Sequence, residues 1–381
     1  MKRCLLSLSA LFAVSTSHAA HIYVMSSQDA ATDNATMSML SVYGHTGTLG
    51  SSFNVFDGTE SLAGYDAVYF IANYNWAWGD MPNTGQEAIR QYVANGGGLV
   101  TAEWVGWKVA VGQFQILNEV LPITNFGSFG YSLTETFTRD ESHPKINNLL
   151  PNSFSMNLTS YAGTTSYFTG AKPGATSFYR MSDPATSIGL AGWSYGMGRV
   201  ASFATTNGPD QIVGAGGRLL SNVFEWATLK QNAQPFAIIT TEGEEFAGDA
   251  NSVLGLYDDD AYASFNSPST LQCSIIMGGV LTTIPTQLTF SAITRATRPG
   301  LAVGVAFWDY TAGVYRFAEG QVAATSFTNV VADAPQNVAR FRDGAGTTAV
   351  RMSWLPINDE DPAQDGWLHE IDFAGWTYET N

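Results

Sequence analysis

The chain has 381 residues, of which 13% are charged and 13% are aromatic, and its formal net charge is −16 at pH 7. This acidic balance excludes nucleic acid and anionic lipid as partners, because both are bound by clustered lysine and arginine. The low charge and the many aromatic residues exclude a disordered chain, and the length suits two domains.

Residues 1–20 have the three parts of a secretory signal peptide. Lys2 and Arg3 form a basic start, residues 4–14 are mainly apolar, and small residues precede an expected cleavage near His21. The apolar run of about 11 residues is shorter than the ~20 residues that cross a bilayer as a helix. We therefore expect an exported protein, secreted or periplasmic, rather than a buried N-terminal helix. No later segment has the length and apolarity of a membrane span.

Residues 21–232 alternate short apolar runs with helical patterns. Strands are predicted at residues 21–25, 66–72, 99–102 and 199–204, and helices at residues 34–43, 84–95, 113–120 and 211–229. Alternating strands and helices predict a mostly parallel sheet with helices on both faces. We therefore expect an α/β domain of the flavodoxin-like class.

The pattern changes after residues 231–235, and residues 236–381 contain predicted strands without helices. Turns rich in Gly, Pro, Asp and Asn separate apolar runs at residues 271–277, 287–294, 301–308, 314–317, 325–331, 348–355 and 368–378. This spacing predicts an all-β, jelly-roll-like sandwich domain. After signal cleavage one cysteine remains, Cys273, and we expect it to be a buried strand residue rather than a reactive thiol.

Four motifs of the first domain occur in a characteristic order. They are Tyr-Asp-Ala-Val-Tyr-Phe at residues 65–70, Tyr-Val-Ala-Asn-Gly-Gly-Gly-Leu-Val at 92–100, His-Pro-Lys-Ile at 143–146 and Tyr-Gly-Met-Gly-Arg-Val at 195–200. With these motifs, residues 21–230 resemble the class I glutamine amidotransferase-like superfamily, in particular the branch of the ThuA-like proteins and the amidotransferase-like domain of some β-galactosidases. The second domain is similar to C-terminal β-sandwiches of large secreted bacterial proteins, a similarity that carries no site residues.

The resemblance implies a catalytic cysteine that this chain lacks. Working members of the superfamily place a cysteine after the glycine-rich strand, where a histidine and a carboxylate activate it. In this sequence Glu103 stands at that place, the domain contains no cysteine, and residues 205–208 lack the later histidine. The elbow histidine of the ThuA-like proteins is also missing. We therefore expect no glutamine hydrolysis.

Two predicted loops, residues 73–80 and 103–108, follow adjacent predicted strands. Ligands of open α/β sheets bind at the carboxyl ends of the strands, so we expect both segments at one ligand-binding mouth. Aromatic faces stack on a sugar, and amide or carboxylate groups bind its hydroxyls. The predicted ligand-binding residues are Asn73, Asn75, Trp76, Trp78, Trp104 and Trp107. The alternative is that the tryptophans form a hydrophobic lid over the end of the sheet.

Glu103, His143 and Asp80 are the candidates for catalysis. Asp80 and Glu103 have the chemistry of a paired-carboxylate glycosidase site, and His143 has the chemistry of a base beside Glu103. The alternative for His143, which precedes a proline, is a structural role in a loop. No cofactor is expected, and the histidine spacing indicates no transition-metal site. The cluster of Asp258, Asp259 and Asp260 is either a calcium site or a solvated acidic loop.

The leading functional hypothesis is an exported relative of the amidotransferases that is not itself an amidotransferase. It would act as a binding or structural accessory protein whose partner is a carbohydrate or a cell-surface polymer. The competing hypothesis is a carbohydrate-active hydrolase that uses the strand-end carboxylates. A third class, a surface-layer or filament subunit, fits the glycine-rich and weakly charged second domain. The sequence defines neither the ligand nor the oligomeric state.

Overall fold

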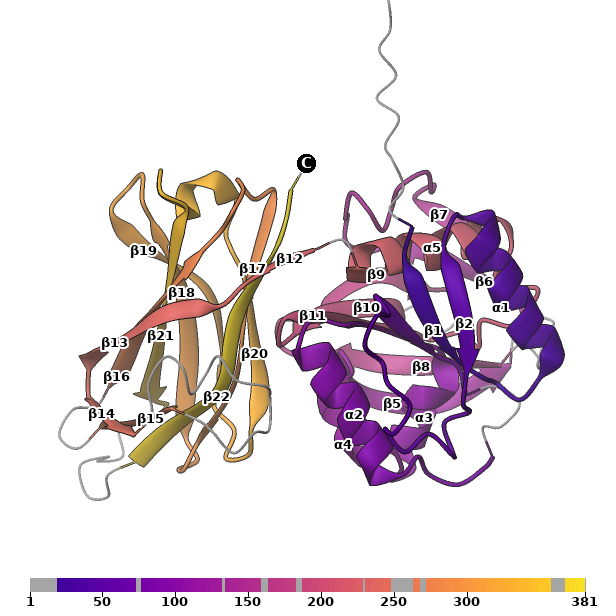
Figure 1. Ribbon diagram of the computed structural model, residues 1–381, viewed down its shortest axis with the longest axis horizontal. Helices are drawn as coiled ribbons and strands as arrows, with labels where there is room; N and C mark the ends of the chain where they lie inside the picture. The colour runs from indigo at the N-terminus through magenta and orange to yellow at the C-terminus, as the bar shows by residue number, and fades with distance from the viewer. Residues whose placement is uncertain are drawn as a thin grey trace, which may run out of the picture.

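The computed structural model of the chain shows two domains side by side (Figure 1). It describes residues 19–72, 77–131, 134–158, 164–182, 187–228, 230–247, 263–267, 272–357 and 367–380. Several predicted features lie outside the described residues: the signal peptide up to residue 18, the ligand-binding candidates Asn73, Asn75 and Trp76, and the aspartate cluster Asp258, Asp259 and Asp260.

The first domain is built on parallel strands in the order β2-β1-β3-β4-β11. Their bounds are β1 His21–Met25, β2 Thr46–Gly50, β3 Ala67–Phe70, β4 Gly98–Thr101 and β11 Gly198–Phe203. Every residue of β3, β4 and β11 is buried, as expected for parallel strands covered on both faces. Each of these strands was predicted from the sequence except β2, which is short, partly exposed and glycine-rich.

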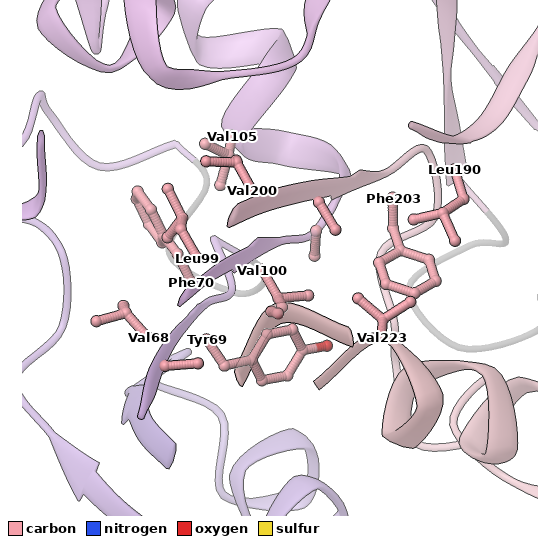
Figure 2. Packing of buried hydrophobic residues seen from close by; sticks show 14 of the residues in the cluster. Val68, Tyr69, Phe70, Leu99, Val100, Val105, Leu190, Val200, Phe203 and Val223 are labelled. Atoms are coloured by element: carbon pink, nitrogen blue, oxygen red, sulfur yellow. The ribbon is translucent and has the colours of Figure 1, made fainter. Parts of the chain in front are cut away.

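Five α-helices in the described residues cover this sheet. They are α1 Ala30–Val42, α2 Asn83–Ala94, α3 Glu103–Ala110, α4 Gln115–Val120 and α5 Gly214–Thr228. Alternate side chains of a strand point to opposite faces. Figure 2 accordingly shows Tyr69 and Val100 on the side of Val223 in α5, whereas Phe70 and Leu99 lie on the side of Val105 in α3. None of the described helices is long and apolar enough to cross a membrane.

The sheet continues beyond β11 as antiparallel strands, which were not predicted from the sequence. The order after β11 is β10-β9-β6-β7, and β5 pairs with β8, which joins β10. Their bounds are β5 Ile123–Tyr131, β6 Thr134–Arg139, β7 Ser153–Asn157, β8 Thr164–Ala171, β9 Thr176–Met181 and β10 Ile188–Tyr195. The expectation of a mostly parallel sheet is therefore correct for the part from β2 to β11 and wrong for the extension.

The second domain consists of two antiparallel sheets. One contains β12 Gln231–Ala233, β14 Glu244–Ala247, β15 Ala263–Ser267, β17 Gln287–Ala296, β20 Thr328–Asp333 and β22 Trp367–Glu379. The other contains β13 Pro235–Glu242, β16 Cys273–Val280, β18 Leu301–Asp309, β19 Val314–Val322 and β21 Thr347–Pro356. Both sheets contribute to one cluster of buried side chains, which includes Met277, Phe307 and Trp376. The seven strands predicted after residue 270 correspond to β16 through β22.

The two domains are packed against each other at β10 and β11. Ile293, Val331 and Phe373 of the second domain are buried in the hydrophobic cluster of the first domain. The side chain of Asn329 donates a hydrogen bond to the carbonyl oxygen of Ser194 at 2.7 Å, and Ser291 Oγ donates to the carbonyl oxygen of Gly196. The β10–β11 turn, part of the motif at residues 195–200, is therefore an interdomain contact.

Candidate functional site

The loop after β3 and the helix after β4 meet at the carboxyl ends of these strands. Lys108 in α3 is buried, and its Nζ donates hydrogen bonds to the carbonyl oxygens of Trp78 and, at 2.9 Å, of Gly79. The ammonium also lies 5.2 Å from the ring centroid of Phe53 and 5.6 Å from that of Phe114. Burial lowers the pKa of Lys108, and the carboxylate of Asp80 opposes this shift. The segment expected as a loop at residues 103–108 is helical, because α3 begins directly after β4.

The tryptophans of this strand-end mouth, defined by Trp78, Trp104 and Trp107, differ in exposure. Trp104 is 7% exposed and Trp107 is half-buried, and their rings pack edge to face with centroids 5.5 Å apart. Trp78 is 40% exposed. Trp104 therefore fits the lid alternative, whereas Trp78 has a ring surface that a ligand can reach.

Asp80 has a structural position in the loop after β3. Its Oδ1 accepts hydrogen bonds from the main-chain N–H groups of Met81 (2.8 Å) and Phe114 (3.0 Å) and from Gln86 Nε2 (3.3 Å). These bonds fasten the loop to α2 and to the start of α4. Glu103 is the first residue of α3, and its side chain lies outside the described residues. A paired-carboxylate role for Asp80 and Glu103 stays a prediction.

His143 lies at the interface with the second domain. Its Nδ1 accepts a hydrogen bond from the main-chain N–H of Lys145 (3.2 Å), so the proton of the neutral ring is on Nε2, which donates to Gln287 Oε1 (2.9 Å). Burial lowers the pKa of His143 to about 4, and the carboxylate of Glu379 opposes this shift. The ring is therefore neutral at pH 7.

The partnership predicted for His143 with Glu103 stays a prediction, and the described contacts of His143 lie near the amino end of β4. His143 lies 3.7 Å from Glu379, which pairs with Arg199, and Arg199 is level with Gly98 at the amino end of β4. Glu103 follows the carboxyl end of the same strand. Four strand residues extend about 13 Å at 3.3 Å each, so the strand separates the two positions. A catalytic role for His143 beside Glu103 would need them at one end of the sheet.

A buried ionic cluster joins the C-terminal strand to the first domain. Glu379 Oε1 lies 2.5 Å from Arg199 Nη1, and Glu379 Oε2 lies 3.2 Å from Lys145 Nζ. Arg199 also donates to the carbonyl oxygen of Trp226 at 2.7 Å. Burial alone would raise the pKa of Glu379, but Arg199, His143 and Lys145 outweigh it and hold the pKa below its ordinary value. This cluster was not predicted from the sequence, because its members are far apart in the chain.

Beside this cluster the two domains enclose a cleft of about 590 Å³. This interdomain cleft is lined from the first domain by residues of β9, β10 and the loop at residues 140–143, and from the second domain by β17 and β20. His143 and Arg199 lie in its lining, whereas the residues of the strand-end mouth do not. The structure therefore presents two separate candidate sites.

A metal centre is not formed by the part of the chain that the structure describes. These residues contain no group of three or more His, Cys, Asp or Glu side chains arranged to hold a metal ion. The candidate calcium ligands Asp258, Asp259 and Asp260 lie outside this part of the chain. Calcium binding there stays a prediction.

No protein-family model and no curated protein matches this sequence. Among solved structures, a ThuA-like protein from Bacteroides uniformis is similar at 15% identity and a TM-score of 0.42, covering 58% of this chain and 96% of that one. A GMP synthase component from Thermoplasma acidophilum is similar at 10% identity and a TM-score of 0.37, covering 54% of this chain and 93% of that one. A β-galactosidase from Bacillus circulans is similar at 12% identity and a TM-score of 0.39, covering 82% of this chain and 41% of that one.

The ThuA-like protein and the GMP synthase component each match a little more than half of this chain. The β-galactosidase match covers more of the chain than either of the other two. At these identities and TM-scores the matches assign no activity to this chain.

Proposed function

We propose that this protein is exported and binds carbohydrate outside the cytoplasm as an accessory protein that is not an amidotransferase. The observation that carries the proposal is Trp78, a ring 40% exposed at the strand-end mouth, on a loop that buried Lys108 holds in place. Sugars stack on such rings through their C–H faces, and tryptophan offers the largest surface for this contact.

Residues 78–81 are held in place by hydrogen bonds before any ligand arrives. Lys108 holds the carbonyl oxygens of Trp78 and Gly79, and Asp80 ties the next part of the loop to Met81 and Phe114. Binding to a preformed surface costs less conformational entropy than binding that must order a loop. The Trp104–Trp107 pair lies on α3, the same helix that carries Lys108.

The absence of an available thiol supports the proposal that the protein is not an amidotransferase. The sequence contains two cysteines, Cys4 in the predicted signal peptide and Cys273 in β16. Cys273 is fully buried, and burial raises the pKa of its thiol to about 12. Because the thiolate is the nucleophile in glutamine hydrolysis, neither cysteine is suited to that reaction.

For the second domain we propose a jelly-roll-like sandwich that belongs to the same binding protein. The support is the strand order: β15-β22-β17-β20 in one sheet and β16-β21-β18-β19 in the other. Late strands are inserted between early ones in both sheets, which is the nested order that two Greek keys produce. In such domains the outer face of each sheet and several loops face solvent.

Affinity electrophoresis tests the proposed function. The mature protein is run through gels that contain starch, xylan, β-glucan, galactan or chitin fragments, and at least one polymer is expected to retard it. Trp78→Ala should lose most of this retardation. Phe317→Ala, a change at a ring 70% exposed on β19 of the second domain, is the matched control and should migrate as the parent does. Unchanged mobility of the parent in every gel would remove the carbohydrate proposal.

Export is tested separately by N-terminal sequencing of the protein recovered from the producing cell and its medium. We expect a mature chain that begins near His21 and is found outside the cytoplasm. An intact N-terminus on cytoplasmic protein would contradict export and would leave the binding test unaffected.

A further inference from the structure

The interdomain cleft has fixed walls that come from both domains. On one side lie residues 174–178 in and before β9, and on the other lie residues 287–289 of β17 and Asp333 of β20. The walls meet where Gly174, at φ +77°, approaches Val331: an added Cβ would lie 2.8 Å from both the Cβ and the carbonyl oxygen of Val331. Neither domain alone forms this cavity.

The floor of the cleft consists of packed rings. Phe178 and Trp226 pack edge to face with centroids 5.5 Å apart, and the ring of His143 lies 5.8 Å from Phe178 and 6.3 Å from Trp226. The guanidinium of Arg199 lies 5.1 Å from the Trp226 ring, and its charge is matched by Glu379. The floor is therefore close to neutral and closely packed, and because Phe178 is 3% and Trp226 5% exposed, a ligand would contact the walls rather than the ring faces.

Polar groups on the walls remain available to a ligand. Asp333 is exposed to the cleft; its Oδ1 accepts a hydrogen bond from Thr289 Oγ1 at 2.5 Å, and its other oxygen has no partner among the described residues. Glu141 is exposed at the rim. These groups provide two strong acceptors within a cavity of ligand size.

The charges of the cleft select against anions. Asp140 is paired with Arg180 at 2.8 Å and Arg199 with Glu379 at 2.5 Å, whereas Glu141 has no basic partner within the described residues. Burial raises the pKa of Asp333, and its hydrogen bond from Thr289 and the charge of Arg199 oppose this shift. Because Arg199 is already paired with Glu379, the cavity is acidic, in a chain whose net charge is −16. A phosphate or uronic acid would be repelled, while a neutral polyhydroxylated ligand would donate its hydroxyls to the carboxylates.

We propose that the interdomain cleft binds a neutral oligosaccharide, with its hydroxyls on the carboxyl groups of Asp333 and Glu141. The ligand class rests on the proposed function, but the site is distinct from the strand-end mouth. The cleft then holds a short segment or chain end, while the exposed Trp78 contacts polymer elsewhere on the molecule.

The test uses tryptophan fluorescence, because Trp193 and Trp226 both line the cleft. The mature protein is titrated with maltotriose, cellotriose, xylotriose, β-1,4-galactotriose and chitotriose (N-acetylated), and with trigalacturonate as the anionic comparison. We expect saturable binding of at least one neutral trisaccharide and none of trigalacturonate.

Two variants change the cleft in different ways. Asp333→Asn keeps the size of the side chain and its acceptor for Thr289 but removes the charge, and Ala334→Trp fills the space beside it without adding charge. Each should weaken binding of the neutral trisaccharide at least tenfold. Glu319→Gln on β19, outside the cleft lining, is the matched carboxylate control and should bind as the parent does. Circular dichroism and the Tm of each variant establish that it is folded.

The outcomes separate the two sites. Parent-like trisaccharide affinity in both Asp333→Asn and Ala334→Trp overturns the cleft proposal, and if Trp78→Ala still abolishes retardation by a polysaccharide, the proposed function stands. Absence of binding to all five neutral trisaccharides also overturns the cleft proposal, whatever the gels show. Tight binding of trigalacturonate contradicts the charge argument and overturns the assigned ligand class.

Discussion

His369 should make the second domain sensitive to acid. Its ring is fully buried, stacked on Trp354 with centroids 4.3 Å apart and edge-on to Trp367 at 4.2 Å, and neither ring nitrogen has a partner in the described part of the chain. A charged imidazolium there would have no compensating group, so burial lowers the pKa of His369 to about 2. The perturbation that tests this is His369→Phe, which keeps an aromatic ring between the two indoles and cannot be protonated.

The sign and size of the effect follow from proton linkage. In the unfolded chain His369 titrates near 6.5, so above that pH both states are neutral and the residue adds no pH dependence. As the pH falls below 6.5, the unfolded state takes up a proton that the folded state cannot accept, and stability falls by about 1.4 kcal/mol per pH unit. Between pH 6.5 and pH 5 the loss from His369 is therefore about 2 kcal/mol.

Urea unfolding followed by tryptophan fluorescence at pH 7 and pH 5 measures this loss. The parent should lose about 2 kcal/mol more of its free energy of unfolding than His369→Phe over this interval. His143, whose pKa is lowered to about 4, adds the same sign of slope to both proteins, so the difference isolates His369. Equal losses in the two proteins would show that His369 is protonated in the folded state and would refute the reasoning.

Four further predictions concern the interface, the mouth and the thiol. Glu379→Gln leaves the buried Arg199 without its carboxylate partner and should lower the free energy of unfolding by about 3 kcal/mol in urea titrations. Lys108→Met leaves the carbonyl oxygens of Trp78 and Gly79 without their donor and should weaken polysaccharide retardation in affinity gels. Gly174→Ala combines a positive φ with a clash against the second domain and should lower the Tm by several degrees in calorimetry. Cys273 should resist a thiol reagent in the native protein at pH 8 and react after unfolding, because burial raises its pKa to about 12.

Local sequence patterns predicted the elements that alternate between sheet and helix. The run at residues 66–72 corresponds to β3, and the helical patterns at residues 84–95 and 211–229 correspond to α2 and α5. These segments are strongly apolar or strongly amphipathic, and glycines mark several of their ends. Such signals are local, so they can be read without knowing the fold.

The antiparallel extension of the first sheet could not be predicted in the same way. β7, Ser-Phe-Ser-Met-Asn, buries alternate residues only, and β10 contains two glycines within a fully buried strand. Short runs of this composition are compatible with loops as well as strands. Whether such a run forms a strand depends on the strands it pairs with. β10, for example, pairs with β11, β9 and β8.

The two candidate sites also differ in this way: local sequence signals predicted the strand-end mouth but not the interdomain cleft. Residues 103–108 were expected near the loop after β3, and the hydrogen bonds from Lys108 to that loop show that they meet. The interdomain cleft was not predicted, because its lining residues contact residues far away in the chain: Arg199 pairs with Glu379, 180 residues later, and His143 bonds Gln287, 144 residues later. No spacing in the sequence encodes such pairs. The sequence around His143, which precedes a proline, does not indicate which residue its side chain contacts.

The motif at residues 195–200 also forms part of the contact between the two domains. In the resemblance it is a glycine turn that feeds a buried strand, and in the structure the turn carries the junction of the domains. Ser291 bonds the carbonyl oxygen of Gly196, and Arg199 pairs with Glu379 at the end of the last strand. Without the second domain, the guanidinium of Arg199 and the apolar surface around it would be uncovered. The first domain is therefore adapted to its partner domain as much as to a ligand, and a cavity at that junction can bind a ligand only while both domains are in place.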